Sequence, residues 1–590
     1  MRKLLLIILF LIVATVAAGQ VSPFSAKIDA VLEKQYKTSN VQPKPFVNEE
    51  TFVRRTYLSI IGRNPTFEEY SSYQKVTVAN KRFELIKFLL KHPGYTSNLY
   101  NFWADTLRLR ERLNNLNNFN GGPYIDYIKD CIAANKPYNV FVKDLLLSNG
   151  SYYDNPATGY YYRDLGMPLD NLIGTGKVFL GTDIGCAQCH DDPFQDFTQR
   201  QFYEMAAMFN QIELRDRNNK EFREKFASLR KEVDELIKAD PMKNRGLNNQ
   251  INNFVRATQA SLEIQPEKQM KLPHDYNYKD AKPLDVVAPK TLDGKGSIAN
   301  KQDLRLDAVN WMVNPSHPTF TKNIVNRYWK WVFGKYIIEE FDNIHDSQLL
   351  NSELMNILAN IFVEVKYDTR EFLYALYCTK LFHREMYEGA FANAEKFVFI
   401  GPVKQRLTAE QIWDSVISIA NEKPENFTLE FHTSYAQLMK TGLEQLTVDG
   451  IKKKVEEYNT VMRGKYEKAP KLGNIYLVRA SEINDQNPAN TALEQLGRSD
   501  RELIQTSSLD GSVTQVISFM NGQLASIAIN PKTVLATNLA GKSPSEKIDM
   551  IFKSVLARKP TIDEKSSFAG VQDDDIIWAL VNSTEFKFQK

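Results

Sequence analysis

Apolar residues recur at helical spacing along most of the chain, whereas the strict alternation typical of half-buried strands is scarce. The spacing is clearest in an early segment with Phe52, Leu58, Ile60 and Ile61 and in a later one with Leu354, Ile357, Leu358 and Ile361. Helix start signals agree, because Thr408 and Gln411 have capping-box spacing and Ser543 precedes Pro544 ahead of a periodic segment. The pattern predicts an all-α protein, with two irregular helical domains, an intervening helical hairpin and an extended linker.

The hairpin is predicted where the composition changes, between Glu221 and Leu262, and dense charges surround a narrow apolar seam. The seam runs first through Phe222, Phe226, Leu229, Val233 and Leu236, and then, after Asp240, Pro241 and Gly246, through Leu247, Ile251, Phe254, Thr258 and Leu262. We expect two antiparallel helices whose apolar faces pack against each other.

Prolines, glycines and lysines without periodicity follow the hairpin and indicate a linker. The predicted organisation is a signal peptide at 1–19, a helical domain at 25–214, the hairpin at 215–264, the linker at 265–300 and a C-terminal helical domain at 301–590.

The N-terminus has the charged, apolar and small-residue order of a secretory signal peptide. Arg2 and Lys3 precede an apolar run from Leu4 to Ala18, and Gly19 follows it. The run is shorter than the roughly 20 residues that span a bilayer. We therefore expect a periplasmic or secreted protein with no stable membrane span after cleavage.

Composition indicates which kinds of protein and which binding partners are compatible with the sequence. The chain has 590 residues, of which 43% are hydrophobic and 25% charged, as in folded globular proteins. Lys and Arg number 74 against 71 Asp and Glu, a balance that gives no electrostatic footprint for nucleic acid. With only 4 cysteines, the chain is not a disulfide scaffold, so the placement of the cysteines matters more than their number.

Two of the cysteines belong to the pentad Cys186-Ala187-Gln188-Cys189-His190, which reads C-x-x-C-H. This spacing lets two thiols add to the vinyl groups of haem while the adjacent imidazole ligates the iron. We predict Cys186 and Cys189 as attachment points for covalent haem c, with His190 as the proximal metal ligand. Export supports this prediction, because covalent haem attachment in bacteria takes place outside the cytoplasm.

Three other interpretations of the pentad remain open. Cys186 and Cys189 could close as a disulfide, although the β-α-β pattern of thioredoxin-like proteins is absent. The cysteines, His190 and either Asp191 or Asp192 could bind zinc, although a second ligand pair is missing. His190 could also simply cap a helix beside buried thiols.

No sixth iron ligand stands out. Met205 and Met208 follow the pentad on a predicted helix, but methionines on an aromatic face are more often core residues. The other histidines are scattered and fit surface or hydrogen-bonded roles better than ligation: His92, His274, His317, His345, His383 and His432. Cys131 and Cys378 could pair with each other in an exported protein.

A cluster of aromatic residues with one guanidinium lies at Arg327, Tyr328, Trp329, Trp331 and Phe333. Such a cluster could stack on a glycan or a protein partner, but the helical spacing favours core packing of Trp329. Arg327 is then expected to pair with a carboxylate such as Asp342 or Glu410. No Ser-His-Asp order, phosphate loop or paired-carboxylate motif stands out, so the sequence supports no particular enzymatic reaction.

Motifs around the pentad and further along the chain follow a family pattern. They are Phe179-Leu180-Gly181, the pentad with Asp191 to Phe194, Gln201 to Tyr203, Ala206 to Phe209, Asn323 to Trp329, Phe333-Gly334, Arg406 to Gln411, Met520 to Gly522 and Trp578 to Phe586. In this order they resemble the cytochrome-like domain of unknown function 1549 followed by domain of unknown function 1553. The resemblance implies an exported planctomycete-type cytochrome-like protein, acting in electron transfer or as the redox partner of an extracellular process. The alternative is a haem-free, zinc-bound or disulfide-closed binding protein in surface glycan processing or assembly.

The sequence departs from the family at informative positions. Asp192 stands where relatives usually carry a second histidine, so any metal-binding role of that histidine is lost here or passes to a carboxylate. Many relatives also have a separate N-terminal cytochrome c module, and none precedes this pentad. The expected electron partner is therefore another, unidentified redox or surface protein.

Overall fold

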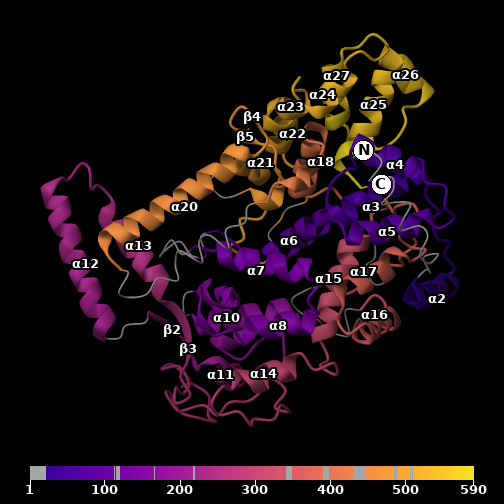
Figure 1. The fold of residues 1–590 in the computed structure, drawn as a ribbon. Coiled ribbons are helices and arrows are strands. Elements are labelled where there is room, and N and C mark those ends of the chain that lie inside the picture. The colour runs from indigo at the N-terminus through magenta and orange to yellow at the C-terminus, as the bar shows by residue number, and fades with distance from the viewer. Residues whose placement is uncertain are drawn as a thin grey trace.

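The computed structural model describes residues 22–111, 113, 120–164, 167–216, 220–339, 344, 349–389, 397–428, 446–483, 488–504, 507, 509 and 511–589. The predicted signal peptide, His345, His432 and Asp342 lie outside these residues. Within them, the chain is mostly helical (Figure 1), as the hydrophobic pattern predicts.

The helices of the N-terminal part are α2 Pro23–Thr38, α3 Glu49–Ile61, α4 Phe67–Gln74, α5 Lys81–Leu90, α6 Pro93–Leu107, α7 Gly122–Ala133, α8 Tyr138–Leu146, α9 Gly159–Tyr162, α10 Pro168–Thr175 and α11 Gln199–Phe209. Single helical turns lie at η1 Pro156–Thr158, η2 Gly176–Leu180, which is π-helical, and η3 Cys186–Gln188. The middle of the chain forms α12 Lys220–Ala239, α13 Leu247–Gln259, α14 Arg305–Met312, α15 Phe320–Phe333, α16 Ser352–Glu364 and α17 Thr369–Tyr377.

The remaining helices are α18 Ala409–Ala420, α20 Val448–Lys468, α21 Pro488–Gln495, α22 Val513–Asn521, α23 Gln523–Ala528, α24 Val534–Leu539, α25 Pro544–Leu556, α26 Ile562–Ser567, α27 Asp573–Asn582 and α28 Thr584–Lys587, with the turns η6 Pro424–Asn426 and η8 Ala480–Glu482. Local sequence fixes several starts. Thr408 and Gln411 form the predicted capping box of α18, and Ser543 accepts the Glu546 N–H at the head of α25.

Strands correct the all-α prediction. β1 Gly150–Ser151, β2 Ile212–Asp216 and β3 Ala260–Ile264 form an antiparallel sheet in the order β1-β3-β2, and β4 Lys471–Leu472 pairs with β5 Ile475–Tyr476. The prediction that a helical face continues to Leu262 is therefore wrong, because α13 ends at Gln259 and Leu262 lies opposite Leu214 in the sheet. Antiparallel pairing of β2 with β3 satisfies the backbone groups of the segments that enter and leave α12 and α13.

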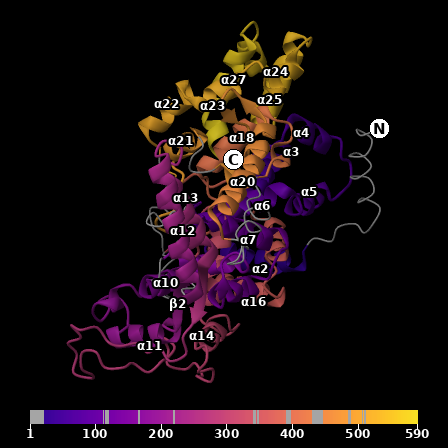
Figure 2. The same cartoon turned by 60° about the vertical axis from the view of Figure 1, so that its left-hand side comes forward.

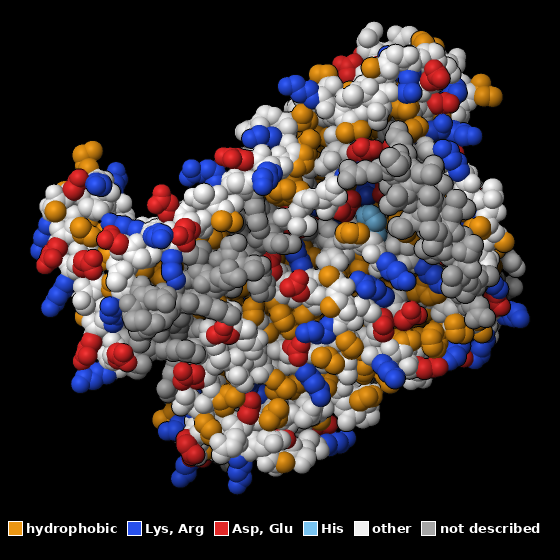
Figure 3. Space-filling view, in the orientation of Figure 1, with side chains coloured by type: hydrophobic (Ala, Val, Ile, Leu, Met, Phe, Trp, Pro, Cys, Tyr) orange, Lys and Arg blue, Asp and Glu red, His pale blue; other side chains and the backbone are white. Residues whose placement is uncertain are grey.

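A projecting arm contains three helices from two distant segments. α12 and α13 contact each other, and both contact α20. Figures 1 and 2 show α20 extending from the C-terminal helices to reach them. Leu229, Val233, Ile251, Phe254 and Ile451 are buried between these helices. Charges of both signs cover the outer surface of the arm (Figure 3).

The buried residues form two core clusters that do not follow the order of the chain. The first joins the N-terminal helices α2–α11 to α14–α17, and the second consists of residues from Leu407 to Phe586 together with Leu58. Consequently α15–α17 pack with the N-terminal helices, although a long segment of chain separates them. No helix within the described ranges is long and apolar enough to cross a membrane.

The aromatic cluster on α15 belongs to the first core. Trp329 is fully buried, with its ring centroid 4.2 Å from that of Phe333 and 5.2 Å from that of Phe399, so the prediction of core packing is confirmed. Arg327 donates to the Asn323 side chain (3.2 Å) and to the Lys177 carbonyl (3.2 Å). Glu410, one expected partner, lies 3.7 Å from Arg498 instead.

Candidate functional site

The C-x-x-C-H pentad forms one tight turn at the surface. The N–H groups of Cys189 and His190 donate to the Cys186 carbonyl at 3.2 and 3.3 Å. Ala187 is fully buried, whereas the side chains of Cys186, Cys189 and His190 are exposed. The buried Ala187 therefore anchors the turn, and both thiols and the imidazole face the solvent.

The segment that leads into the pentad is held by α15. The turn η2 ends at Gly181, whose φ of +59° favours glycine, and a Cβ there would lie 2.7 Å from the Ile344 side chain. Asn323 of α15 donates to the Val178 carbonyl at 2.8 Å, and Arg327 reaches Lys177. The Ile344 N–H donates to the Gly181 carbonyl at 2.8 Å. Residues that are distant in the sequence thus hold in place the segment that precedes the pentad.

His190 has a defined ring orientation. Its Nδ1 lies 2.8 Å from the Asp191 carbonyl oxygen. A carbonyl oxygen only accepts, so this contact places the proton of the neutral imidazole on Nδ1 and leaves the Nε2 lone pair available. A metal-ligating histidine characteristically has its second nitrogen hydrogen-bonded in this way.

Both aspartates after the pentad use their carboxylates within the loop. Asp191 Oδ1 accepts the Gln199 N–H at 2.8 Å, and Asp192 Oδ1 accepts the N–H groups of Phe194 and Gln195 at 2.8 and 3.1 Å. Asp192 therefore shapes the turn that follows the pentad. In the described part of the chain, no group of three or more His, Cys, Asp or Glu residues is arranged to hold a metal ion.

Apolar and aromatic residues adjoin the pentad. Phe194 is 86% exposed, which is unusual for a side chain of this size. Tyr203 of α11 is buried, and this burial, together with nearby Cys189 and Asp275, raises the pKa of its hydroxyl.

The methionines considered as iron ligands lie in the core. Met205 and Met208 are both fully buried on α11, as expected for core residues.

Three of the scattered histidines have hydrogen-bonding roles, which agrees with their predicted assignment. His92 and His317 accept backbone N–H groups near the starts of α6 and α15, and His383 Nε2 lies 3.1 Å from the Tyr377 carbonyl. Burial lowers the pKa values of His317 and His383 to about 4. His274 is exposed.

Cys131 and Cys378 are free buried thiols and form no disulfide. Burial raises the pKa of each thiol, and each has its own tyrosine neighbour, Tyr127 for Cys131 and Tyr374 for Cys378. The pairing that the sequence left open for these two cysteines is therefore not found. Cys186 and Cys189 are also free.

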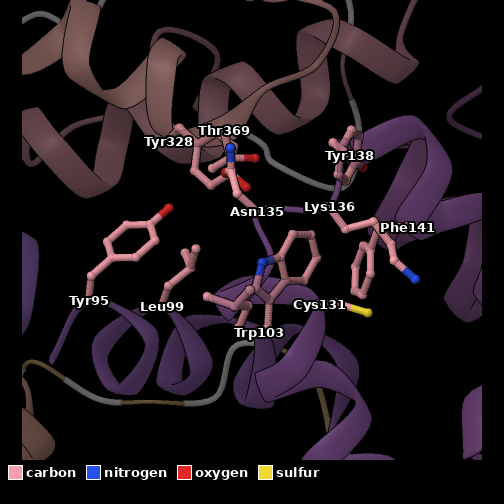
Figure 4. Close-up of a pocket in the computed structure, with 11 residues that line it drawn as sticks. Tyr95, Leu99, Trp103, Cys131, Asn135, Lys136, Tyr138, Phe141, Tyr328 and Thr369 are labelled. Carbon is pink, nitrogen blue, oxygen red and sulfur yellow. The ribbon is translucent and has the colours of Figure 1, made fainter. Parts of the chain in front are cut away.

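A small pocket lies away from the pentad, among α6, α7, α8, α15 and α17 (Figure 4). Five aromatic side chains line it together with aliphatic and polar ones; the lining includes Cys131 but no pentad residue. The Tyr95 and Tyr138 hydroxyls are buried without a hydrogen-bond partner among the described residues. The cavity volume of about 30 Å³ has room for about two water molecules, so it does not offer a site for a large cofactor.

Sequence reasoning missed two residues that contact the pentad loop. Gln199 is buried at the start of α11, and its Nε2 donates to the carbonyls of Gln188 and Cys189 at 3.2 and 3.0 Å. Tyr278, from the predicted linker, accepts the Asp191 N–H through its hydroxyl at 2.7 Å. Neither residue has a spacing signal that links it to C-x-x-C-H.

The chain belongs to two families in tandem: residues 27–214 match the family described as "Protein of unknown function (DUF1549)", and residues 304–571 match "Protein of unknown function (DUF1553)". The resemblance noted from the motifs is thereby confirmed. The pentad lies in the first matched region and α15 in the second. No curated protein matches the chain, and no solved structure does.

Proposed function

We propose that this protein is an exported electron-transfer protein that resembles a single-haem c-type cytochrome. Cys186 and Cys189 hold haem c covalently, and His190 is its proximal ligand. The observation that carries the proposal is the joint exposure of two free thiols and an imidazole on one turn.

The donor set suits haem in two ways. Neither cysteine forms a disulfide and both are exposed, and thioether formation requires free, accessible thiols. The His190 Nδ1 faces a carbonyl oxygen, so Nε2 is the atom free to ligate iron. When bound, the haem supplies a one-electron redox centre. Exposed Phe194 provides apolar, aromatic surface four residues after His190 in the sequence.

The wider setting is part of the same proposal. The signal peptide at 1–19 delivers the chain to the periplasm or the exterior, where the electron partner is another redox or surface protein. The functional organisation is a haem-bearing domain at 25–214, the helical hairpin at 215–264, the linker at 265–300 and a second helical domain at 301–590. A glycan is a further candidate ligand of the assembly.

The test is expression of the full chain in a host that attaches haem c, followed by acid–acetone extraction, absorbance spectroscopy and mass measurement. We expect a Soret band that survives extraction and a mass gain of one haem. Cys186→Ser and Cys189→Ser should abolish covalent retention, and His190→Ala should keep the porphyrin but alter the iron spectrum. Cys131→Ser is the matched control and should retain haem as the wild type does.

Two results would overturn the proposal. The first is stoichiometric zinc without visible absorbance, and the second is a Cys186–Cys189 disulfide with no haem in the same host. Either result would favour the alternative, a haem-free, zinc-bound or disulfide-closed binding protein in surface glycan processing or assembly.

A further inference from the structure

The predicted linker is not a free tether where it passes the pentad. Its segment from Leu272 to Asp280 is fixed by the burial of Leu272 and Tyr276. Its backbone is also paired, since the Leu272 N–H donates to the Asp285 carbonyl at 3.0 Å and the Val287 N–H to the Met270 carbonyl at 2.9 Å. In Figures 1 and 2 the irregular chain of this region lies beside α11. We call residues 272–280 the strap.

The strap is attached to α11 on one side and to the pentad loop on the other. Arg200 of α11 donates to the Asp280 carboxylate at 3.1 Å and to the Asp280 carbonyl at 2.9 Å. The Tyr276 hydroxyl donates to the Asp280 carboxylate at 2.7 Å. The rings of Tyr276 and Tyr278 pack against each other with their centroids 5.4 Å apart. The Tyr276 ring thus supports the ring of Tyr278, whose hydroxyl accepts the Asp191 N–H.

Asp191 is consequently held at two separate points. Its N–H donates to Tyr278, and its carboxylate accepts the N–H of Gln199. Gln199 also binds the Gln188 and Cys189 carbonyls through its side chain. The remaining polar group of Asp191, its carbonyl, is the one that faces His190 Nδ1.

We propose that Tyr278 of the strap and Gln199 of α11 are positioning residues for the His190 imidazole. This inference rests on the proposed haem-binding function. The His190 ring is exposed, so packing does not fix it, and its orientation depends on the Asp191 carbonyl. Tyr278 and Gln199 determine where that carbonyl points. Tyr278 acts through the Asp191 N–H, whereas Gln199 acts through the Asp191 carboxylate and the Gln188 and Cys189 carbonyls. Neither of the two bonds to the thiols or to the imidazole nitrogens.

Tyr278→Phe tests the proposal with little change in shape. The variant removes the acceptor of the Asp191 N–H but keeps both cysteines, so covalent haem should be retained. The group that faces His190 directly, the Asp191 carbonyl, remains in this variant, so its hydrogen bond is misdirected and not removed. We therefore expect the cyanide concentration that half-saturates the haem iron to shift from the wild-type value, because the orientation of an axial histidine tunes the iron.

Tyr276→Phe is the matched control. It lies in the same strap and also loses one hydroxyl, but that hydroxyl bonds to Asp280 and not to the pentad loop. Its cyanide titration should follow the wild type. A second measurement, amide hydrogen exchange of the peptide spanning residues 186–195 in the haem-free protein, should be faster in Tyr278→Phe and unchanged in Tyr276→Phe.

The outcomes separate the two proposals. A wild-type protein that acquires no haem overturns the proposed function and this inference with it. A haem-bearing wild type whose Tyr278→Phe variant matches it in cyanide titration and in hydrogen exchange overturns the positioning role alone. Equal effects of Tyr276→Phe and Tyr278→Phe would also overturn it, because the strap would then act only through its general stability.

Discussion

The pentad loop and the junction between the two core clusters both concentrate polar groups, but they use them in opposite ways. At the junction, Arg63 binds Glu425 and Glu69, each at 2.7 Å, and Arg479 binds Asp414 at 2.7 Å as well as Glu425. The guanidiniums and Asp414 are buried, and each has ionic partners. At the pentad, the backbone is hydrogen-bonded while the thiols and the imidazole point outward.

The polar groups of the junction are engaged in stabilising the fold, whereas the thiols and the imidazole of the pentad are exposed. Although burial alone would raise it, Arg63 and Arg479 hold the pKa of Glu425 well below its ordinary value. Perturbed groups often indicate functional sites, but here they join α3 and α4 to the C-terminal helices through satisfied ion pairs. The side chains on which the haem proposal rests, those of Cys186, Cys189 and His190, are instead exposed to solvent. Mutations in the two regions should therefore have different consequences.

Removing one cation from the junction should have the largest effect on stability. Arg479→Met leaves Asp414 buried with a hydrogen bond from the Ala480 N–H but without its ion pair. Breaking a buried pair in this way costs about 3–5 kcal/mol of unfolding free energy. Urea denaturation followed by circular dichroism measures it. Lys34→Met, in an exposed pair with Glu353, is the control and should cost less than about 1 kcal/mol. If the two variants lowered the unfolding free energy equally, the buried ion pairs of the junction would be no more important for stability than an exposed pair.

Trp329→Ala should be nearly as damaging, because Trp329 is fully buried against Phe333 and Phe399. Truncating a large buried aromatic costs about 3–5 kcal/mol. Phe194→Ala, beside the pentad, removes an exposed ring and should change the unfolding free energy by less than about 0.5 kcal/mol. A Trp329→Ala variant with an unchanged melting temperature would show that this aromatic cluster serves recognition rather than packing.

The sequence predicts local features well and misses what distant segments bring together. The capping box at Thr408 and Gln411 and the start of α25 at Ser543 depend on residues a few positions apart, and both are found. The sequence around Leu262 is compatible with either a helix or a strand. The pairing of Leu262 with Leu214, which is distant in the sequence, makes this segment a strand. The third helix of the arm, α20, has no sequence signal that relates it to α12.

The candidate site shows the same division. The pentad spacing identifies Cys186, Cys189 and His190 without any structure. Tyr278 lies 87 residues from the Asp191 N–H that it accepts, within a segment whose composition indicates only a linker. Asn323 and Arg327 reach the turn before the pentad from α15, also without a sequence signal. A side chain that acts by binding another residue's backbone belongs to no sequence motif that would identify this role.

Glu425→Gln should show that the contribution of the junction to stability depends on pH. The pKa of Glu425 is lower in the folded protein than the value of about 4.3 expected for the unfolded chain, so its ion pairs stabilise the fold above that pH. This stabilisation is lost as the pH falls through the lower, folded-state value. The variant should therefore be less stable than the wild type at pH 7, and the gap should narrow below about pH 4. Paired urea titrations at pH 7 and pH 3 measure the gap. A gap of constant size would mean that the carboxylate charge contributes nothing.

The smallest effect on stability is expected at the pentad itself. Cys186→Ser and His190→Ala alter exposed side chains on a turn whose hydrogen bonds are formed by the backbone, by Gln199 and by Tyr278. In the haem-free protein each variant should change the unfolding free energy by no more than about 0.5 kcal/mol, measured by the same urea titration. Ala187→Asp at the buried centre of the turn is the opposing control, because it places a charge in the core and should destabilise strongly. If Cys186→Ser destabilised the haem-free protein as much as Ala187→Asp, the thiol would have a structural role, and the contrast between an exposed reactive turn and a buried ionic junction would fail.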